Sequence, residues 1–139
     1  MAAAEQIYEG SCLCGKVRYR IAGKPGPLSN CHCTDCRKSH GAAFATYLDV
    51  PRNQLTFLQG EAELQTFRAE SGTKRSFCRT CGSIIRCWSD DDPNLMEIAA
   101  GTLDTRLDQK PLSHIWVRSK VPWYEIQDGQ PQHSTHSPS

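Results

Sequence analysis

The fold of this chain is decided by the stretch Cys78-Arg79-Thr80-Cys81-Gly82, which has the form of a zinc knuckle. Two cysteines separated by two residues can bind one ion, and the glycine after them supplies the positive φ at which the loop turns back. An earlier stretch, Cys12-Leu13-Cys14-Gly15, offers a second pair. Its cysteines would point to the same face of a strand. Two such pairs, far apart in sequence, can form a tetrahedral four-thiolate zinc site that ties the fold together.

A third group of cysteines lies between these two pairs, at Cys31, Cys33 and Cys36. It offers three thiolates and no obvious fourth ligand. Three protein ligands and one exchangeable position are what a catalytic zinc needs, so we interpret this group as an open zinc site. The alternatives are closure by a fourth ligand, a second structural site, or redox thiols without metal, and the grouping alone does not decide which pairs share an ion. The candidates for a fourth ligand are His32, His40 and Cys87.

Length and composition indicate a soluble globular protein. The chain has 139 residues, of which 38% are hydrophobic and 22% are charged. We expect a single domain over residues 1–128 and a disordered tail over residues 129–139, because the tail is polar and has nothing to bury. Eight cysteines without a leader sequence favour metal ligands in the reducing cytoplasm over disulfides.

The charge balance and the hydrophobic pattern disfavour two classes of partner. Lys plus Arg number 16 against 15 Asp plus Glu, so no broadly basic surface is available to bind nucleic acid. No segment approaches the roughly 20 consecutive apolar residues that span a bilayer. We therefore expect a cytoplasmic protein with neither a nucleic-acid nor a membrane partner.

The pattern of apolar residues predicts an all-β fold with little helix. Residues 16–21 alternate between apolar and basic side chains, as a half-buried strand does. Further short β-prone runs are separated by turn signals, and the only helical turn is expected at residues 34–39, with Thr34 as its cap. The expected runs are residues 43–50, 54–58, 63–67, 75–77, 83–88, 95–99 and 114–117.

The cysteine motifs, together with their flanking residues, resemble one known family, the glutathione-dependent formaldehyde-activating enzymes, also called the centromere protein V family. The likeness covers residues 8–128 and includes the C-terminal stretch from His114 to Tyr124. Its three ordered motifs are Gly10-Ser11-Cys12-Leu13-Cys14-Gly15, Cys31-His32-Cys33-Thr34-Asp35-Cys36, and Phe77-Cys78-Arg79-Thr80-Cys81-Gly82.

The resemblance implies a fold, a ligand pairing and an activity. The fold would be a β-tent of the Mss4-like kind, built from short antiparallel strands around zinc. The activity would be that of a carbon–sulfur lyase that makes or cleaves S-hydroxymethylglutathione from glutathione and formaldehyde. Two Zn²⁺ per chain are implied, a structural ion held by Cys12, Cys14, Cys78 and Cys81, and a catalytic ion held by Cys31, Cys33 and Cys36.

Two further residues are candidates for proton transfer at the open site. Asp35 and His40 lie close to the cysteines in sequence and could act as acid or base. The alternative roles are structural, with Asp35 capping the local turn and His40 orienting a ligand. The second functional hypothesis for the whole chain is a non-catalytic zinc module that binds a protein partner, because a fold does not determine a function.

Overall fold

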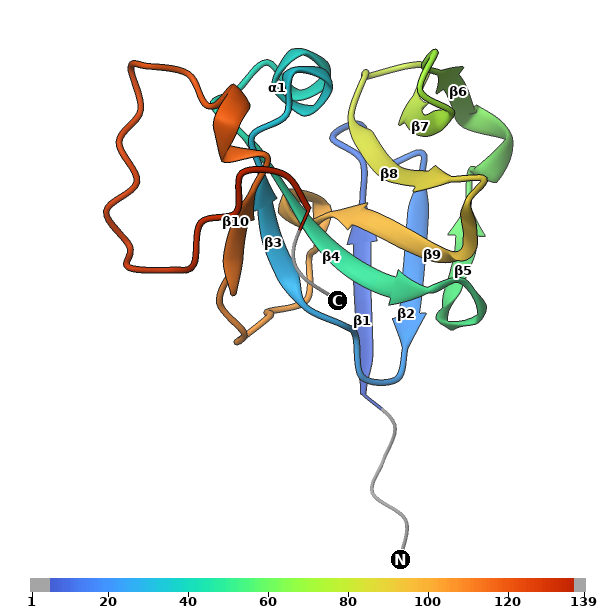
Figure 1. The fold of residues 1–139 in the computed structure, drawn as a ribbon. Helices are drawn as coiled ribbons and strands as arrows, with labels where there is room; N and C mark the ends of the chain where they lie inside the picture. The colour runs from blue at the N-terminus through green and yellow to red at the C-terminus, as the bar shows by residue number, and fades with distance from the viewer. Residues whose placement is uncertain (1–5, 137–139) are drawn as a thin grey trace, which may run out of the picture. The chain divides into compact units, whose positions relative to one another are not determined.

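The computed structural model describes residues 6–136 and confirms the all-β class (Figure 1). The described residues form ten strands, one α helix and four short 3-10 helices. The strands are β1 (Ile7–Ser11), β2 (Arg18–Ala22), β3 (Leu28–Cys31), β4 (Ala45–Pro51), β5 (Leu55–Gln59), β6 (Leu64–Arg68), β7 (Thr73–Cys78), β8 (Ile84–Ser89), β9 (Asp92–Ala99) and β10 (Ser113–Ile115). The helices are α1 (Thr34–His40), η1 (Arg52–Gln54), η2 (Glu61–Glu63), η3 (Ala100–Thr102) and η4 (Val117–Ser119).

The Cα positions divide the chain into two compact units. The first unit consists of Met1–Gly26 and Leu48–Asp108, and the second of Pro27–Tyr47 and Gln109–Ser139. Each unit contains one of the two cysteine groups that the sequence analysis singled out. The single domain expected over residues 1–128 stays a prediction.

The first unit is built from antiparallel strands. One sheet has the order β1-β2-β5, and β6, β7, β8 and β9 pair in succession, with β9 next to β4. Along β2, Tyr19 and Ile21 are fully buried and alternate with exposed arginines, as the alternation of residues 16–21 predicts. Ile85, Met96 and Ile98 are buried on β8 and β9.

The second unit is built on β3, which pairs in parallel with β10 and lies next to β4. The sequence analysis did not predict β3, because its residues Leu-Ser-Asn-Cys do not alternate between apolar and polar. Asn30 is buried there, and its side-chain oxygen accepts a hydrogen bond of 2.6 Å from the Thr46 hydroxyl. This bond satisfies a polar group that would otherwise be costly to bury.

The predicted helical turn is present as α1, but its cap is a different residue. The N-cap is Cys33, whose sulfur accepts a hydrogen bond from the amide of Cys36, so the expectation of Thr34 as cap is wrong. The helix ends at His40, and its C-cap is Gly41, which is left-handed with a φ of 61°. Helix α1 is therefore fixed at its beginning by a cysteine of the middle group.

Several of the last described residues form backbone hydrogen bonds with residues 114–118. The amide of His114 donates to Pro131, that of His133 donates to His114, and that of Trp116 donates to Thr135. These bonds differ from the disordered tail expected from Gly129 onward. A polar segment can be ordered in this way because β10 presents backbone groups that need partners. Residues 137–139 of the expected tail lie outside the described residues.

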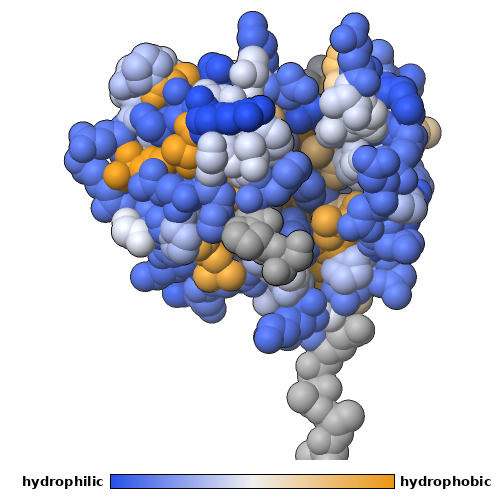
Figure 2. Space-filling view, in the orientation of Figure 1, coloured by the Kyte–Doolittle hydropathy of each residue, from blue (hydrophilic) through white to orange (hydrophobic). Residues whose placement is uncertain are grey.

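Hydrophilic side chains cover most of the face seen in Figure 2, with separate smaller hydrophobic areas. Within residues 6–136, no helix is long and apolar enough to cross a membrane.

Candidate metal centres

The first centre brings together the two cysteine pairs of the first unit. The sulfurs of Cys12, Cys14, Cys78 and Cys81 all lie within 4.8 Å of one another. The Cys12 and Cys14 sulfurs are 3.6 Å apart, and those of Cys14 and Cys78 are 3.8 Å apart. A tetrahedral ion with Zn–S bonds of about 2.3 Å requires sulfurs about 3.8 Å apart. These four thiolates therefore fit one zinc ion.

Local backbone geometry directs the two cysteine pairs toward a common position. Gly15 and Gly82 have φ values of 81° and 80°, which confirms the positive φ expected where each loop turns back. The Gly15 amide donates to the Cys12 carbonyl, and the Gly82 amide donates to the Cys78 carbonyl. No heavy atom lies near the Cβ position of either glycine. Glycine is therefore favoured here because of its positive φ, and not because a side chain would clash.

Hydrogen bonds make the four thiols unequal. Bonds from the side chain and backbone of Ser83 lower the pKa of Cys81 to about 5, because they stabilise its thiolate. A backbone bond from Lys16 favours the Cys14 thiolate, but desolvation and the neighbouring thiols outweigh it and raise the pKa of Cys14 to about 11. A bound cation would therefore have to displace a proton from Cys14 but not from Cys81 at neutral pH.

The second centre lies in the second unit, where β3 leads into α1. The sulfurs of Cys31, Cys33 and Cys36 lie within 4.8 Å of one another, and Cys31 and Cys36 are buried. The thiols of Cys33 and Cys36, together with burial, raise the pKa of Cys31. Three anionic sulfurs cannot crowd together without a positive charge, so this donor set also fits a metal ion.

None of the proposed fourth ligands joins this group among the described residues. His32 is fully buried, but its Nε2 is 2.8 Å from Nδ1 of His114. Nε2 of His40 is 3.0 Å from the Tyr47 hydroxyl. Cys87 is buried on β8 in the first unit and belongs to neither group. Within residues 6–136, the second centre thus has three ligand atoms.

A buried polar network lies directly beside the second centre. Nε2 of His114 is 2.7 Å from a carboxylate oxygen of Asp128, whose side chain is 43% exposed. Together with the bond from His32 to His114, this forms a continuous path from a residue between two cysteines to solvent. Burial and the neighbouring His114 and Lys120 lower the pKa of His32 to about 4, so its ring is neutral at pH 7.

A second contact connects His40 to the cysteines through a tyrosine. The sulfur of Cys36 is 3.9 Å from the Tyr47 hydroxyl, and Tyr47 is almost fully buried on β4. His40 therefore reaches the centre through Tyr47, which the sequence analysis missed. Asp35 lies exposed in the first turn of α1, and no hydrogen bond or ion pair of its side chain is found among the described residues.

This arrangement defines the class of the protein, an all-β protein with one group of four cysteines and one group of three, each of which could hold a metal ion. Residues 7–119 match the family of glutathione-dependent formaldehyde-activating enzymes, and the chain belongs to this family. The resemblance noted in the sequence is thereby confirmed.

Two comparisons, one of sequence and one of structure, show how far the likeness extends. A protein of Halomonas elongata, named "Putative glutathione-dependent formaldehyde-activating enzyme", is 31% identical over 129 residues, which cover 87% of this chain and 82% of the relative. The crystal structure of a Rhodobacter sphaeroides protein superposes with a TM-score of 0.61 at 21% identity. That superposition covers 72% of this chain and 91% of the other, and it supports the fold alone.

Proposed function

We propose that this protein is a zinc-dependent carbon–sulfur lyase that makes or cleaves a thiol–aldehyde adduct, such as S-hydroxymethylglutathione. The observation that carries the proposal is the second centre, where the described residues supply three thiolates and no fourth ligand. Membership of the glutathione-dependent formaldehyde-activating family supports glutathione as the thiol and formaldehyde as the aldehyde. The first centre would have a structural role.

The donor set favours a thiol as the species activated at the second centre. When bound, a zinc ion on three thiolates supplies a soft electrophile, and soft sulfur ligands suit it better than a carbonyl oxygen does. Cys31, Cys33 and Cys36 would hold that ion. The buried surroundings of Cys31 and Cys36 keep water away from two of these ligands.

The reaction also requires a group that handles one proton. Addition of a thiol to formaldehyde breaks the S–H bond, forms a C–S bond and places a proton on the former carbonyl oxygen. We assign this proton to the Tyr47 hydroxyl, which lies near the sulfur of Cys36 and is backed by Nε2 of His40. In the cleavage direction the same pair would remove the proton from the hydroxymethyl group.

The test combines metal content with turnover. Protein purified without added metal is analysed for zinc, and glutathione-dependent loss of formaldehyde is followed after subtraction of the uncatalysed rate. We expect about two zinc ions per chain, with turnover that Cys33→Ser abolishes and the matched variant Cys87→Ser retains. Zinc without thiol-dependent turnover would reject the lyase and favour a non-catalytic module that binds a protein partner.

A further inference from the structure

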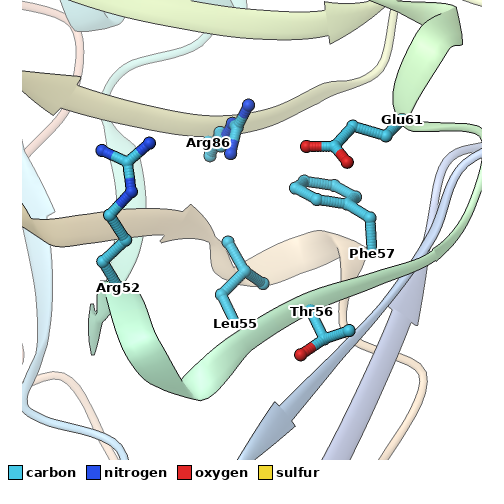
Figure 3. A pocket seen from close by; sticks show the side chains of 6 residues that line it. All are labelled: Arg52, Leu55, Thr56, Phe57, Glu61 and Arg86. Carbon is cyan, nitrogen blue, oxygen red and sulfur yellow. The ribbon is translucent and has the colours of Figure 1, made fainter.

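A pocket outside both centres lies in the first unit. Its volume is about 310 Å³, at the small end of the range of about 300–1,000 Å³ for ligand sites. None of its residues belongs to either centre, so the proposed lyase chemistry makes no use of them. The lining residues are Arg52, Leu55, Thr56, Phe57, Glu61 and Arg86 (Figure 3).

Arg86 is held rigidly in this pocket by aromatic rings. Its guanidinium carbon lies 4.8 Å from the ring centre of Phe57 and 4.7 Å from that of Trp88. Its Nε donates to the hydroxyl of Ser76, the residue opposite it on β7. Contacts of this kind fix the guanidinium plane, so little side-chain entropy remains to be lost when a ligand binds.

Neither arginine of the pocket forms an ion pair among the described residues. Among residues 6–136, no carboxylate lies within the 4.0 Å ion-pair distance of Arg52 or Arg86. Arg52 donates instead to the carbonyl of Pro93. Burial lowers the pKa of Arg86 and nearby Arg52 adds to this, while Glu61 opposes it. A partly buried guanidinium, with a second, exposed guanidinium lining the same pocket, favours an anionic ligand.

Glu61 faces the pocket from the other side. In Figure 3 its carboxylate is directed toward Arg86, with Arg52 on the far side of Arg86. The backbone just before Glu61 requires glycine, because Gly60 has a φ of 75° and a Cβ there would collide with the carbonyl oxygen of Lys16. A carboxylate on one side and two guanidiniums on the other make the pocket dipolar.

We propose that this pocket binds a small acidic α-amino acid, with its two carboxylates at Arg52 and Arg86 and its ammonium group at Glu61. Two guanidiniums and one carboxylate give the pocket a charge of +1, and such a ligand carries the matching set of two carboxylates and one ammonium. Leu55 and Phe57, two apart on β5, offer apolar contact for its methylene groups.

The experiment is a titration of the zinc-loaded, ¹⁵N-labelled full chain with L-glutamate at constant ionic strength, followed by amide chemical shifts. We expect saturable shifts at β5 and β8, and loss of these shifts in Arg86→Gln. The matched control is Arg106→Gln, which removes an exposed arginine paired with Asp108 and should bind as the wild type does. Unchanged glutamate binding by Arg86→Gln, or no saturable shift in the wild type, would overturn the proposal.

Glutarate, which lacks the ammonium group, tests the role of Glu61. The Kd of glutarate should be at least about tenfold higher than that of L-glutamate, because a hydrogen bond between charged groups is lost. Glu61→Gln should remove this preference. Equal affinity for both ligands in the wild type would show a plain anion site and reject the amino-acid assignment. None of these measurements depends on turnover, so a negative result would reject the amino-acid site without rejecting the lyase proposal.

Discussion

The two cysteine centres differ in how much of the chain each one joins. In the first unit, Cys14 and Cys78 lie 64 positions apart in sequence, and their sulfurs are 3.8 Å apart. In the second unit, all three sulfurs come from one short segment, residues 31–36. An ion that closes a long loop removes more entropy from the unfolded chain than one that closes a short loop. The first centre is therefore the one on which folding should depend.

The centres also differ in the groups around them. Backbone amides and Ser83 surround the sulfurs of the first centre, and four thiolates complete its ligand set. The three thiolates of the second centre are accompanied by the histidine network and by Tyr47. A complete set of four sulfurs suits a structural ion, whereas three sulfurs beside groups that can carry protons suit chemistry.

The largest expected effect compares Cys78→Ser with Cys33→Ser. Cys78→Ser should abolish cooperative unfolding, because structural zinc contributes about 10–16 kcal/mol to folding in small zinc domains, comparable to the total stability of a protein. Cys33→Ser should stay folded with about one zinc ion per chain. Thermal unfolding by circular dichroism and native mass spectrometry measure both outcomes. Equal unfolding of the two variants would break the distinction between the centres.

A smaller effect is expected at the tyrosine of the second centre. Tyr47→Phe removes the hydroxyl near Cys36 and keeps the buried ring, so turnover should fall by about 10²-fold or more, as for loss of a general acid or base. His40→Gln should give a partial loss, since its amide can still hydrogen-bond the hydroxyl. Asp35→Asn, on the exposed side of α1, is the matched control. Unaltered turnover in Tyr47→Phe would exclude the proton role.

A weaker effect should follow from changes to the histidine network. Asp128→Asn removes the charge that faces His114 but keeps an oxygen that can accept its hydrogen bond. If this network positions the segment that carries Cys31 and Cys33, zinc at the second centre should bind about 10-fold more weakly, with Asp128→Ala losing more. Competition with a chromogenic chelator measures this affinity, and ¹⁵N shifts of the His114 ring report its tautomer.

Loss of the first-centre zinc in Asp128→Asn would contradict this interpretation, because no residue of the network belongs to the first unit. An unchanged tautomer of His114 together with unchanged zinc affinity would show that the carboxylate has no positioning role.

The sequence could predict the individual cysteine motifs because each one is local. The glycines after Cys14 and Cys81 indicate the turns, and the spacing within each pair indicates that its two sulfurs can bind one ion. Which pairs share a site did not follow from the spacing and was implied only by the family resemblance. Most strands were predicted from short local runs of β-prone residues between turn signals, and β2 also shows a clear alternation of buried and exposed side chains. The helical turn at residues 34–39 was also predicted, but its cap was assigned to Thr34 because a cysteine is not an ordinary cap.

The missed features depend on single residues that only tertiary structure brings together. His114, Asp128 and Tyr47 stand alone in the sequence, and no spacing rule relates them to the cysteines. Strand β3 was missed because Asn30 is buried through a bond from Thr46. The hydrogen bonds of residues 131–135 could not be predicted, because their partners are backbone groups of β10 and its neighbours, which leave no trace in side-chain composition.

The smallest expected effect concerns how stability depends on pH. It separates the contribution of one carboxylate, Asp49, from the contribution of the two cysteine centres. Burial, with a contribution from Asp92, raises the pKa of Asp49 on β4 to about 6 from its usual 3.8. The folded state then holds a proton that the unfolded state has lost, so this group costs stability as the pH rises from about 4 through 6. The cost is complete at pH 7.

Asp49→Asn should therefore raise the Tm by a few degrees at pH 7 and leave it nearly unchanged well below pH 3.8, near pH 3, where both states of the wild type are largely protonated. Protonation of the cysteines affects wild type and variant alike, so it cancels in the difference between their Tm values. The control Asp91→Asn changes an exposed side chain and should show no such difference. An equal change in Tm at both pH values would mean that Asp49 acts through packing. The pH dependence of stability would then have to be assigned to other groups, first of all to the cysteine centres.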